Sequence, residues 1–398
     1  MPDSKNPFSA EELDQIRKET PGVQHVVHFN NAGASLMNIQ VAQKVSEYLD
    51  HELRYGGYET AIEYRQQIEA TYQNIADHLQ CNFREVAIME NATVAWQQAL
   101  LSIPWKPDDI ILTSRAEYAS NYIAFLQLQK RLGVEVKPIP NNEFGEVDVQ
   151  ALESIIQPRV RLIAITHIPT NGGLVNPAAE IGSIARKYGI WYLLDACQSA
   201  GQMSLNVKEI GCDFLSATSR KFLRGPRGVG LLYVNERILP GLEPVLLDLH
   251  GATWDTPTSY RIRPDARRFE NWEFNLAGVL GLSEAIAYAS SLGIDRIWQR
   301  IQYLADLLRT GLEQIPDVSV HDLGRVKSGI VSFKGPFNSK RMKLRLGKAG
   351  FNTSLIVPEG TLLDMQDRGL GEMIRASVHY YNDENEIRQF VSYIKEHI

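Results

Sequence analysis

The chain has 398 residues, of which 44% are hydrophobic and 22% are charged. At about 150 residues per domain, this length predicts two or three domains and excludes a single small module. The 41 basic and 47 acidic residues give a net charge of -6, so no overall basic field attracts nucleic acid or anionic lipid. The apolar runs, such as Leu162–Ile165, are far shorter than the ~20 residues of a membrane-spanning helix. We therefore expect neither nucleic acid nor a membrane as a partner.

The first residues and the cysteines bear on the compartment. Residues 1–7 lack the charged and apolar segments of a secretory signal. The three cysteines, Cys81, Cys197 and Cys212, cannot form a closed disulfide framework. We therefore expect a protein of the reducing cytoplasm. The nine histidines include no His-x-x-x-His pair and the cysteines no Cys-x-x-Cys pair, so we predict no metal site.

Short apolar segments alternate with helical segments between Phe29 and Tyr233. This alternation predicts an α/β domain with a largely parallel sheet that helices cover on both faces. The predicted strands are Val86–Met89, Asp109–Thr113, Val134–Ile139, Leu162–His167, Trp191–Ala196, Phe214–Ala217 and Val229–Val234. The predicted helices are Val41–Arg54, Thr60–Leu79, Val94–Ser102, Asn121–Leu132, Val149–Ile156 and Ala178–Tyr188.

The pattern changes after Asn235 to a segment rich in proline and arginine, and a long helical stretch follows from Ala277 to Gln314. The remainder predicts a smaller α+β domain. Its expected strands lie near Gly329–Lys334 and Ile374–His379, and its expected helices near Ser339–Ala349 and Glu384–Ile398. We therefore expect an N-terminal arm at 1–24, a large domain at 25–270, and a linking helix with a small C-terminal domain at 271–398.

Two polar motifs follow predicted strands, where ligands gather in such a sheet. One strand ends at Asp195, which Gln198 follows closely, and another precedes a turn in which Lys221 has Arg220 and Arg224 nearby. Neighbouring positive charge favours the neutral amine that Schiff-base chemistry requires. Pyridoxal phosphate requires a lysine for its aldehyde, a carboxylate for its pyridine nitrogen and donors for its phosphate. These two motifs supply all three.

Together and in this order, the motifs resemble the class V aminotransferase family of pyridoxal-phosphate enzymes, over nearly the whole chain. The resemblance implies a fold type I (aspartate aminotransferase-like) enzyme. Its large domain would hold a mainly parallel seven-stranded sheet, and its small C-terminal domain would be α+β. The segment Ser219–Gly228 looks most like the isopenicillin N epimerase-like and ergothioneine-pathway C–S lyase branch, because an arginine precedes the lysine where cysteine desulfurases commonly have histidine.

The resemblance also implies a role for each matching residue around the cofactor, pyridoxal 5′-phosphate. Lys221 is the catalytic residue and binds the cofactor covalently. Asp195 meets the pyridine nitrogen, and Gln198 meets the phenolic oxygen of the ring. Thr218 and Arg220 bind the phosphate.

A third segment, Glu90–Trp96, matches the phosphate loop of the family. Ala92 and Thr93 open a helix there, where backbone N–H groups form an anion site and the Thr93 hydroxyl adds a donor. Without the resemblance, Asn91 or Thr93 as a plain helix cap explains the segment equally well.

Two further positions would contact the cofactor ring. Tyr118 stands where the family stacks an aromatic or histidine ring on the pyridine, although a half-buried surface tyrosine would show the same pattern. The segment His167–Gly172 matches the stretch that contacts the ring oxygen. Either Thr170 or Asn171 makes that contact, and the sequence leaves the choice open.

The substrate would be held by residues from both ends of the chain. Arg375 matches the arginine that binds the substrate α-carboxylate through two parallel hydrogen bonds, and a structural ion pair is the alternative. The stretch Asn31, Ala32 and Gly33 resembles the segment that closes over the substrate. The resemblance also implies a homodimer, although 271–275 lacks the threonine with which desulfurases reach the neighbouring subunit's phosphate.

The missing loop cysteine bears on the reaction. Cysteine desulfurases attack the substrate sulfur with a cysteine on a C-terminal loop, but Asn352–Arg375 contains no cysteine. We predict a lyase that cleaves a C–S bond of a cysteine-derived amino acid by β-elimination and releases pyruvate and ammonia. This reaction needs only a base, an electron sink and a carboxylate anchor. A class V aminotransferase or amino-acid epimerase is the alternative, and a cysteine desulfurase or selenocysteine lyase is less favoured. The substrate itself stays open.

Overall fold

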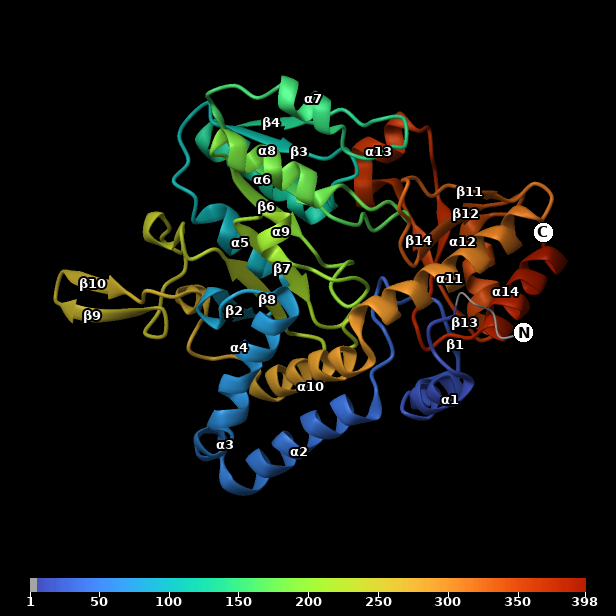
Figure 1. Cartoon of the computed structure of the whole chain (residues 1–398), viewed down its shortest axis with the longest axis horizontal. Helices are drawn as coiled ribbons and strands as arrows, with labels where there is room; N and C mark the ends of the chain where they lie inside the picture. Colours follow the sequence, from blue (N-terminus) through green and yellow to red (C-terminus); the bar gives the residue numbers. More distant parts are fainter. Residues whose placement is uncertain (1–5) are drawn as a thin grey trace.

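The computed structural model describes residues 6–398 and is built around a seven-stranded sheet (Figure 1). The strand order is β2-β8-β7-β6-β5-β3-β4, and only β8 runs against its neighbours. The predicted α/β fold with a mainly parallel seven-stranded sheet is therefore confirmed. The strands are β2 (Val86–Met89), β3 (Ile110–Thr113), β4 (Glu135–Pro138), β5 (Val160–Thr166), β6 (Trp191–Asp195), β7 (Phe214–Thr218) and β8 (Gly230–Val234).

Helices cover both faces of this sheet. The helices α5 (Ala92–Leu101) and α6 (Ala119–Leu132) pack on one face. On the other face pack α4 (Arg65–Leu79), α8 (Ala178–Tyr188) and α10 (Leu276–Leu292).

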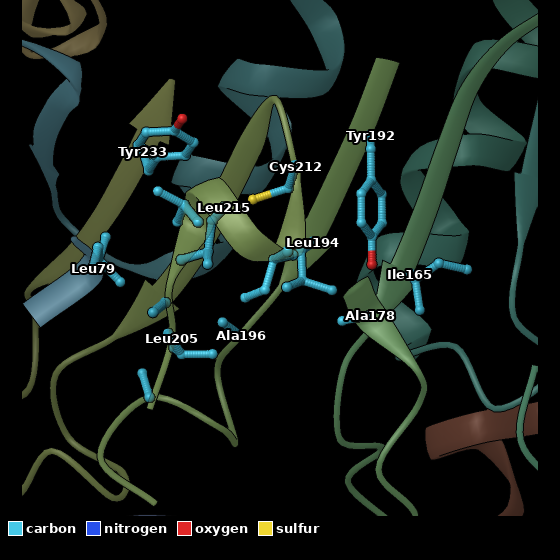
Figure 2. Packing of buried hydrophobic residues seen from close by; sticks show 14 of the residues in the cluster. Leu79, Ile165, Ala178, Tyr192, Leu194, Ala196, Leu205, Cys212, Leu215 and Tyr233 are labelled. Carbon is cyan, nitrogen blue, oxygen red and sulfur yellow. The ribbon is translucent and has the colours of Figure 1, made fainter. Parts of the chain in front are cut away.

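Each strand of the sheet contributes side chains to the apolar cores on both of its faces, because successive residues of a strand point to opposite faces. Leu193 of β6 is buried beneath α5 and α6, whereas Tyr192 and Leu194 are buried on the opposite face (Figure 2). A strand buried on both faces forms a continuous apolar run, and for that reason β6 is recognisable in the sequence.

The predicted helical stretch from Ala277 to Gln314 is two helices, α10 and α11 (Ile294–Glu313), which meet at an 80° bend. Gly293 lies at the bend with φ +84°, a conformation that residues with a side chain rarely adopt. The bend carries the chain from the large sheet to the smaller one. Within residues 6–398, no single helix is long and apolar enough to cross a bilayer, although α10 and α11 pass that test when taken together across the bend.

A four-stranded antiparallel sheet in the order β11-β12-β15-β14 forms the second unit (Figure 1). Its core contains side chains from α11 and from the last helix. The N-terminal segment joins this unit, because β1 pairs with β13 in parallel and Ser377 N–H donates to the Phe29 carbonyl. Residues 27–28, which the sequence places in the large domain, are thus paired with the C-terminal part of the chain. The predicted domain boundaries stay a prediction.

The other strands lie outside the large sheet. They are β1 (Val27–His28), β9 (Ala252–Thr256), β10 (Ser259–Ile262), β11 (Ser319–Val320), β12 (Ile330–Lys334), β13 (Phe351–Asn352), β14 (Ser354–Ile356) and β15 (Met373–Ser377). The other α-helices are α1 (Ala10–Lys18), α2 (Ile39–Tyr55), α3 (Gly57–Glu63), α7 (Val149–Ser154), α9 (Val207–Ile210), α12 (Ser339–Lys348), α13 (Leu362–Asp367) and α14 (Glu384–Glu396). The hairpin β9–β10 lies in the proline- and arginine-rich segment and projects from the molecule (Figure 1).

Candidate active site

The predicted site residues gather at the carboxyl ends of the parallel strands. Asp195 ends β6, between the ends of β5 and β7, and pairs in register with Thr166 and Ser216. Thr218 ends β7 and pairs with Gly230 at the start of β8. Ligands bind at this edge in sheets of this kind.

Two hydrogen bonds fix the carboxylate of Asp195, which is buried. The Cys197 N–H donates to Oδ1 over 2.9 Å, and Asn121 Nδ2 donates to Oδ2 over 2.8 Å. Each oxygen keeps a further lone pair. The carboxylate can therefore accept a proton-bearing nitrogen from a ligand.

Lys221 lies near Asp195 and is largely enclosed. Burial is the main cause that lowers the pKa of its amine, and the positive charges of Arg220 and Arg375 lower it further. Asp195 acts in the opposite sense. The predicted cationic neighbourhood is present, but its effect is secondary to burial. A larger fraction of the amine is neutral than at an exposed lysine.

Arg224 does not contribute to the positive charge around Lys221, because its guanidinium is bonded to other residues. It donates to the Leu36 carbonyl over 2.8 Å, to the Tyr380 hydroxyl over 2.7 Å and to the Thr20 hydroxyl over 2.6 Å. The side chain is fully buried in these contacts. Arg224 therefore ties the turn that carries Lys221 to both ends of the chain.

His379 strengthens the same turn. Its Nδ1 accepts from the Tyr380 N–H, which leaves Nε2 to donate to the Phe222 carbonyl over 3.0 Å. Burial holds the pKa of His379 well below its usual range, so the ring stays neutral in this arrangement. The residue after Lys221 is thereby anchored to the C-terminal part of the chain.

The predicted phosphate-binding residues lie on adjoining elements. Asn91 is the N-cap of α5 and accepts from the Val94 N–H, so the cap role falls to Asn91 rather than Thr93. Ala92 and Thr93 then form the first positions of the helix. A Cβ on Gly230 would lie 2.6 Å from the Asn91 carbonyl carbon, so β8 meets this turn at close range.

Thr218 and Arg220 complete the same corner of the site. Gly230 pairs with Thr218, which places the start of α5 beside the end of β7. Arg220 Nη1 donates to the Thr218 hydroxyl over 2.9 Å. A helix N-terminus, a hydroxyl and a guanidinium together make an anion site.

Arg375 approaches the site from β15. Its Nη1 donates to the Thr170 carbonyl over 2.9 Å and to the Thr170 hydroxyl over 2.6 Å, and Nη2 lies 3.4 Å from Asn30 Oδ1. Burial lowers the pKa of Arg375 to about 10, and the phenol of Tyr118 acts in the opposite sense. Tyr118 is the N-cap of α6. The arrangement is a buried cation without a carboxylate partner among residues 6–398.

The structure separates Thr170 from Asn171, which the sequence leaves as alternatives. The Thr170 hydroxyl also lies 3.4 Å from Gln198 Nε2, within the site. Asn171 Nδ2 instead donates to the Thr361 hydroxyl over 3.0 Å. Thr170 is thus beside Arg375 and Gln198, and Asn171 faces the segment around Thr361.

The N-terminal segment closes one side of the site. Ser35 N–H donates to the Arg220 carbonyl over 2.9 Å, and the Ala32 carbonyl accepts from Gln198 Nε2 over 3.1 Å. The amide of Asn31 is consumed by structural bonds, one of them to the Ser377 carbonyl at 2.7 Å. Gly33 N–H donates to the Asn30 carbonyl. The Ala32 N–H is also bonded within the protein, to Ser377 Oγ over 2.9 Å, and the role of Asn31, Ala32 and Gly33 in substrate binding stays a prediction.

Sequence reasoning missed several contributors. Glu117 and Asn121 follow β3 and are bonded to each other, and Asn121 is also bonded to Asp195, although the sequence draws attention only to Tyr118 between them. Their spacing of four residues at a helix start was the available signal.

The segment Arg268-Phe269-Glu270 is structural, since Glu270 accepts from the Ile88 N–H over 2.7 Å and Arg268 donates to the Leu239 carbonyl over 2.8 Å.

The residues present fit pyridoxal 5′-phosphate. The site offers a partly enclosed amine, a fixed carboxylate and an anion corner. Gln198 Oε1 and Arg375 Nε are buried without a partner among residues 6–398, so each can bond to a ligand in the site. Residues 6–398 contain no group of three or more His, Cys, Asp or Glu that could hold a metal ion. The fold and the site define a pyridoxal-phosphate-dependent enzyme of fold type I.

The chain matches the Aminotransferase class-V family over residues 27–390 and belongs to that family. A probable cysteine desulfurase of Pyrococcus abyssi (strain GE5 / Orsay) is 27% identical over 404 residues, covering 96% of this chain and 97% of the relative. The apo structure of a cysteine desulfurase from Thermococcus onnurineus NA1 is 26% identical with a TM-score of 0.90, covering 97% and 98% of the two chains. A cystine C–S lyase complexed with cysteine persulfide shares the fold at 23% identity and a TM-score of 0.85, with 95% and 99% covered.

Proposed function

We propose that this enzyme cleaves a C–S bond of a cysteine-derived amino acid by β-elimination. The observation that carries the proposal is the chemistry of the segment Asn352–Arg375. This segment ends at Arg375, which lies beside Thr170 in the site, yet it contains no thiol. A persulfide-forming nucleophile is therefore missing where a C-terminal loop would present one.

The three thiols that the chain does contain are poor nucleophiles. Cys197 lies beside Asp195 and Lys221, but burial and the Asp195 charge raise the pKa of its thiol well above the usual range. Burial raises the pKa of Cys81 to about 12 and also raises that of Cys212. Because the thiolate is the nucleophile, these groups react slowly at neutral pH.

In the proposed reaction, Arg375 and the backbone at Ala32 hold the substrate with its Cα near Lys221. Asp195 pairs with the pyridine nitrogen, Gln198 meets the ring oxygen, Tyr118 covers the ring, and the corner of Ala92, Thr93, Thr218 and Arg220 takes the phosphate. Pyridoxal phosphate supplies an electron sink for negative charge at Cα. Lys221 Nζ removes the Cα proton and is the general base.

The bond changes balance without a further reactant except water. The electron pair of the Cα–H bond forms the Cα–Cβ double bond, and the electron pair of the Cβ–S bond leaves with sulfur. The proton held on Lys221 neutralises the departing thiolate. Water then hydrolyses the released aminoacrylate to pyruvate and ammonia.

Cysteine desulfurase activity is the second candidate, because the relatives from Pyrococcus and Thermococcus carry that name. In that case Cys197 would have to act as the nucleophile. A class V aminotransferase or epimerase would use the same base and carboxylate anchor. The products distinguish these activities.

We expect a variant with all three cysteines replaced by alanine to retain pyruvate formation within a few-fold of the wild type. Purified enzyme is incubated with cystine, S-alkyl cysteines and cysteine, and pyruvate, alanine and sulfane sulfur are assayed in the same samples. Elimination is supported by pyruvate in an amount equal to that of the released sulfur product, which is a thiol from an S-alkyl cysteine, a persulfide from cystine and sulfide from cysteine. Alanine with sulfane sulfur that disappears with Cys197→Ala would establish a desulfurase instead, and neither product would indicate an aminotransferase or epimerase.

We also propose that the enzyme is a homodimer that works in a reducing compartment, where its free cysteines persist. Apolar side chains of α2 and α3 are exposed, with Leu53 84% and Ile62 75% accessible. They lie near a groove of about 820 Å³ that Tyr58, Trp272 and Phe274 help to line. A second copy of the chain would bury this apolar surface.

The double variant Leu53→Glu/Ile62→Glu should convert the dimer to a monomer, because each change places a charge in the apolar contact. Light scattering should give about twice the 44.8 kDa chain mass for the wild type and the single-chain mass for the variant. Leu344→Glu on α12, where the side chain is 61% exposed, is the matched control and should remain dimeric. A wild-type monomer contradicts the proposal.

A further inference from the structure

A buried polar bridge lies behind Asp195. Asn121 Nδ2 donates to Asp195 Oδ2 over 2.8 Å and also to Glu117 Oε1 over 2.8 Å. All three side chains are at most 5% exposed. One amide nitrogen thus joins two carboxylates, one at the end of β6 and the other after β3.

The double donation fixes which way the amide faces. An asparagine has two N–H donors on its nitrogen and only acceptor capacity on its oxygen. With both donors spent on carboxylates, the amide cannot flip without turning its oxygen towards Asp195 or Glu117. The hydrogen-bonding partner that holds Asn121 in place is therefore Glu117.

Glu117 is itself held by donors from β5 and from the end of β3. The Thr166 N–H donates to Oε2 over 2.9 Å and the Thr166 hydroxyl donates to Oε1, while Ser114 Oγ donates over 3.1 Å and Thr113 Oγ1 over 3.2 Å. No lysine or arginine among residues 6–398 forms an ion pair with it. Burial, together with the Asp195 charge, raises the pKa of Glu117, and the bonds from Thr166 and Asn121 oppose this shift.

A buried carboxylate without a cation is unfavourable for the fold on its own, because its desolvation is not offset by an opposite charge. The contacts of Glu117 indicate that its carboxylate orients Asn121 at the site. It receives hydroxyl and backbone donors from the end of β3 and from β5, it accepts from the Tyr118 N–H over 3.2 Å, and its bond to Asn121 orients the amide that faces Asp195. The bridge leads only to the carboxylate assigned to the pyridine nitrogen.

We propose that Asn121 is a positioning residue that orients the Asp195 carboxylate towards the pyridine nitrogen of the cofactor, and that Glu117 orients Asn121. The inference rests on the role proposed for Asp195. Removing the bridge should weaken only those cofactors that carry a ring nitrogen. Loss of one hydrogen bond to a charged group corresponds to about 10- to 100-fold in affinity.

The test compares two probes on the apoenzyme of each variant. The first is pyridoxal 5′-phosphate, and the second is its carbocyclic analogue, in which C–H replaces the ring nitrogen. Tryptophan fluorescence titration gives both dissociation constants. Asn121→Ala should weaken pyridoxal phosphate about 10-fold or more and change the analogue by no more than about twofold. Asn74→Ala, which removes an amide bonded to Ser283 at 2.8 Å outside the site, is the matched control and should change neither constant.

A second variant and a second readout guard against a folding defect. Glu117→Gln preserves shape but allows the Asn121 amide to flip, so it should show the same selective loss to a smaller extent. Nitrogen-15 NMR of ring-labelled cofactor should show a weaker pyridinium signal in both variants. Equal loss for the two probes would mean a structural role and would overturn the inference, as would an unchanged affinity for pyridoxal phosphate. If wild-type protein binds neither probe, the cofactor assignment itself fails.

Discussion

Replacing Lys221 with alanine should abolish the visible absorbance band of the cofactor-bound enzyme and reduce turnover by about 10⁴-fold. The amine is the only group in the site assigned both to bind the cofactor aldehyde and to remove the Cα proton. Loss of a positioned general base alone removes about 10²- to 10⁴-fold of rate, and loss of the covalent link adds to this. The reason for choosing Lys221 is its enclosure, since burial lowers the pKa of the amine and favours the neutral form.

The experiment is a spectrum before and after borohydride reduction, followed by peptide mapping of the reduced protein. Wild-type enzyme should lose its visible band and carry the cofactor on the peptide containing Lys221. Lys208→Ala, which removes a lysine of the short helix α9 away from the site, should behave as wild type. A band that persists in the Lys221→Ala protein and is reduced onto another lysine would reject the assignment.

Arg375→Ala should raise KM for the amino-acid substrate by about 30-fold or more, which corresponds to ~2 kcal/mol. The guanidinium is buried beside Thr170, and its Nε lacks a partner among residues 6–398, so it can donate to a substrate carboxylate. Arg375→Lys should recover only part of the loss, because an ammonium group cannot form two parallel bonds.

The pH dependence of KM tests the same residue independently. Burial lowers the pKa of Arg375 to about 10, so the cation is present at neutral pH and is lost as the pH rises through about 10. KM of the wild type should therefore rise above pH 10, and KM of Arg375→Ala should lack this rise. Arg261→Ala, which removes an exposed ion pair with Asp255, serves as the control. An unchanged KM in Arg375→Ala would assign the residue to structure alone.

The large sheet was predictable because its parallel strands are buried on both faces and form short, continuous apolar runs. The bend at Gly293 was not, because apolar helical periodicity continues from α10 into α11. A single glycine inside such a pattern is compatible with an uninterrupted helix. The pairing of β1 with β13 was equally hidden, since two-residue strands more than 300 positions apart leave no local signal.

The same distinction applies to the site. Asp195 and Lys221 were found because each directly follows an apolar strand, and strand ends converge at one edge. The bond from Asn121 to Asp195 spans 74 positions and joins a helix start to a strand end. The geometry of this bond depends on how α6 packs against the sheet. The sequence of apolar and polar residues does not specify that packing. The sequence therefore indicated Asp195 and Lys221, which the structure brings together at one edge of the sheet, and it missed Asn121 and Glu117 behind Asp195.

The turn that carries Lys221 has a consequence for the order in which the molecule folds. Arg224 bonds to Thr20 and Leu36, and Phe222 bonds to His379. Each of these bonds spans at least 157 positions of the sequence. Contacts between such distant segments form only after the entropy of closing long loops has been overcome, so we expect the turn to reach its final geometry late in folding.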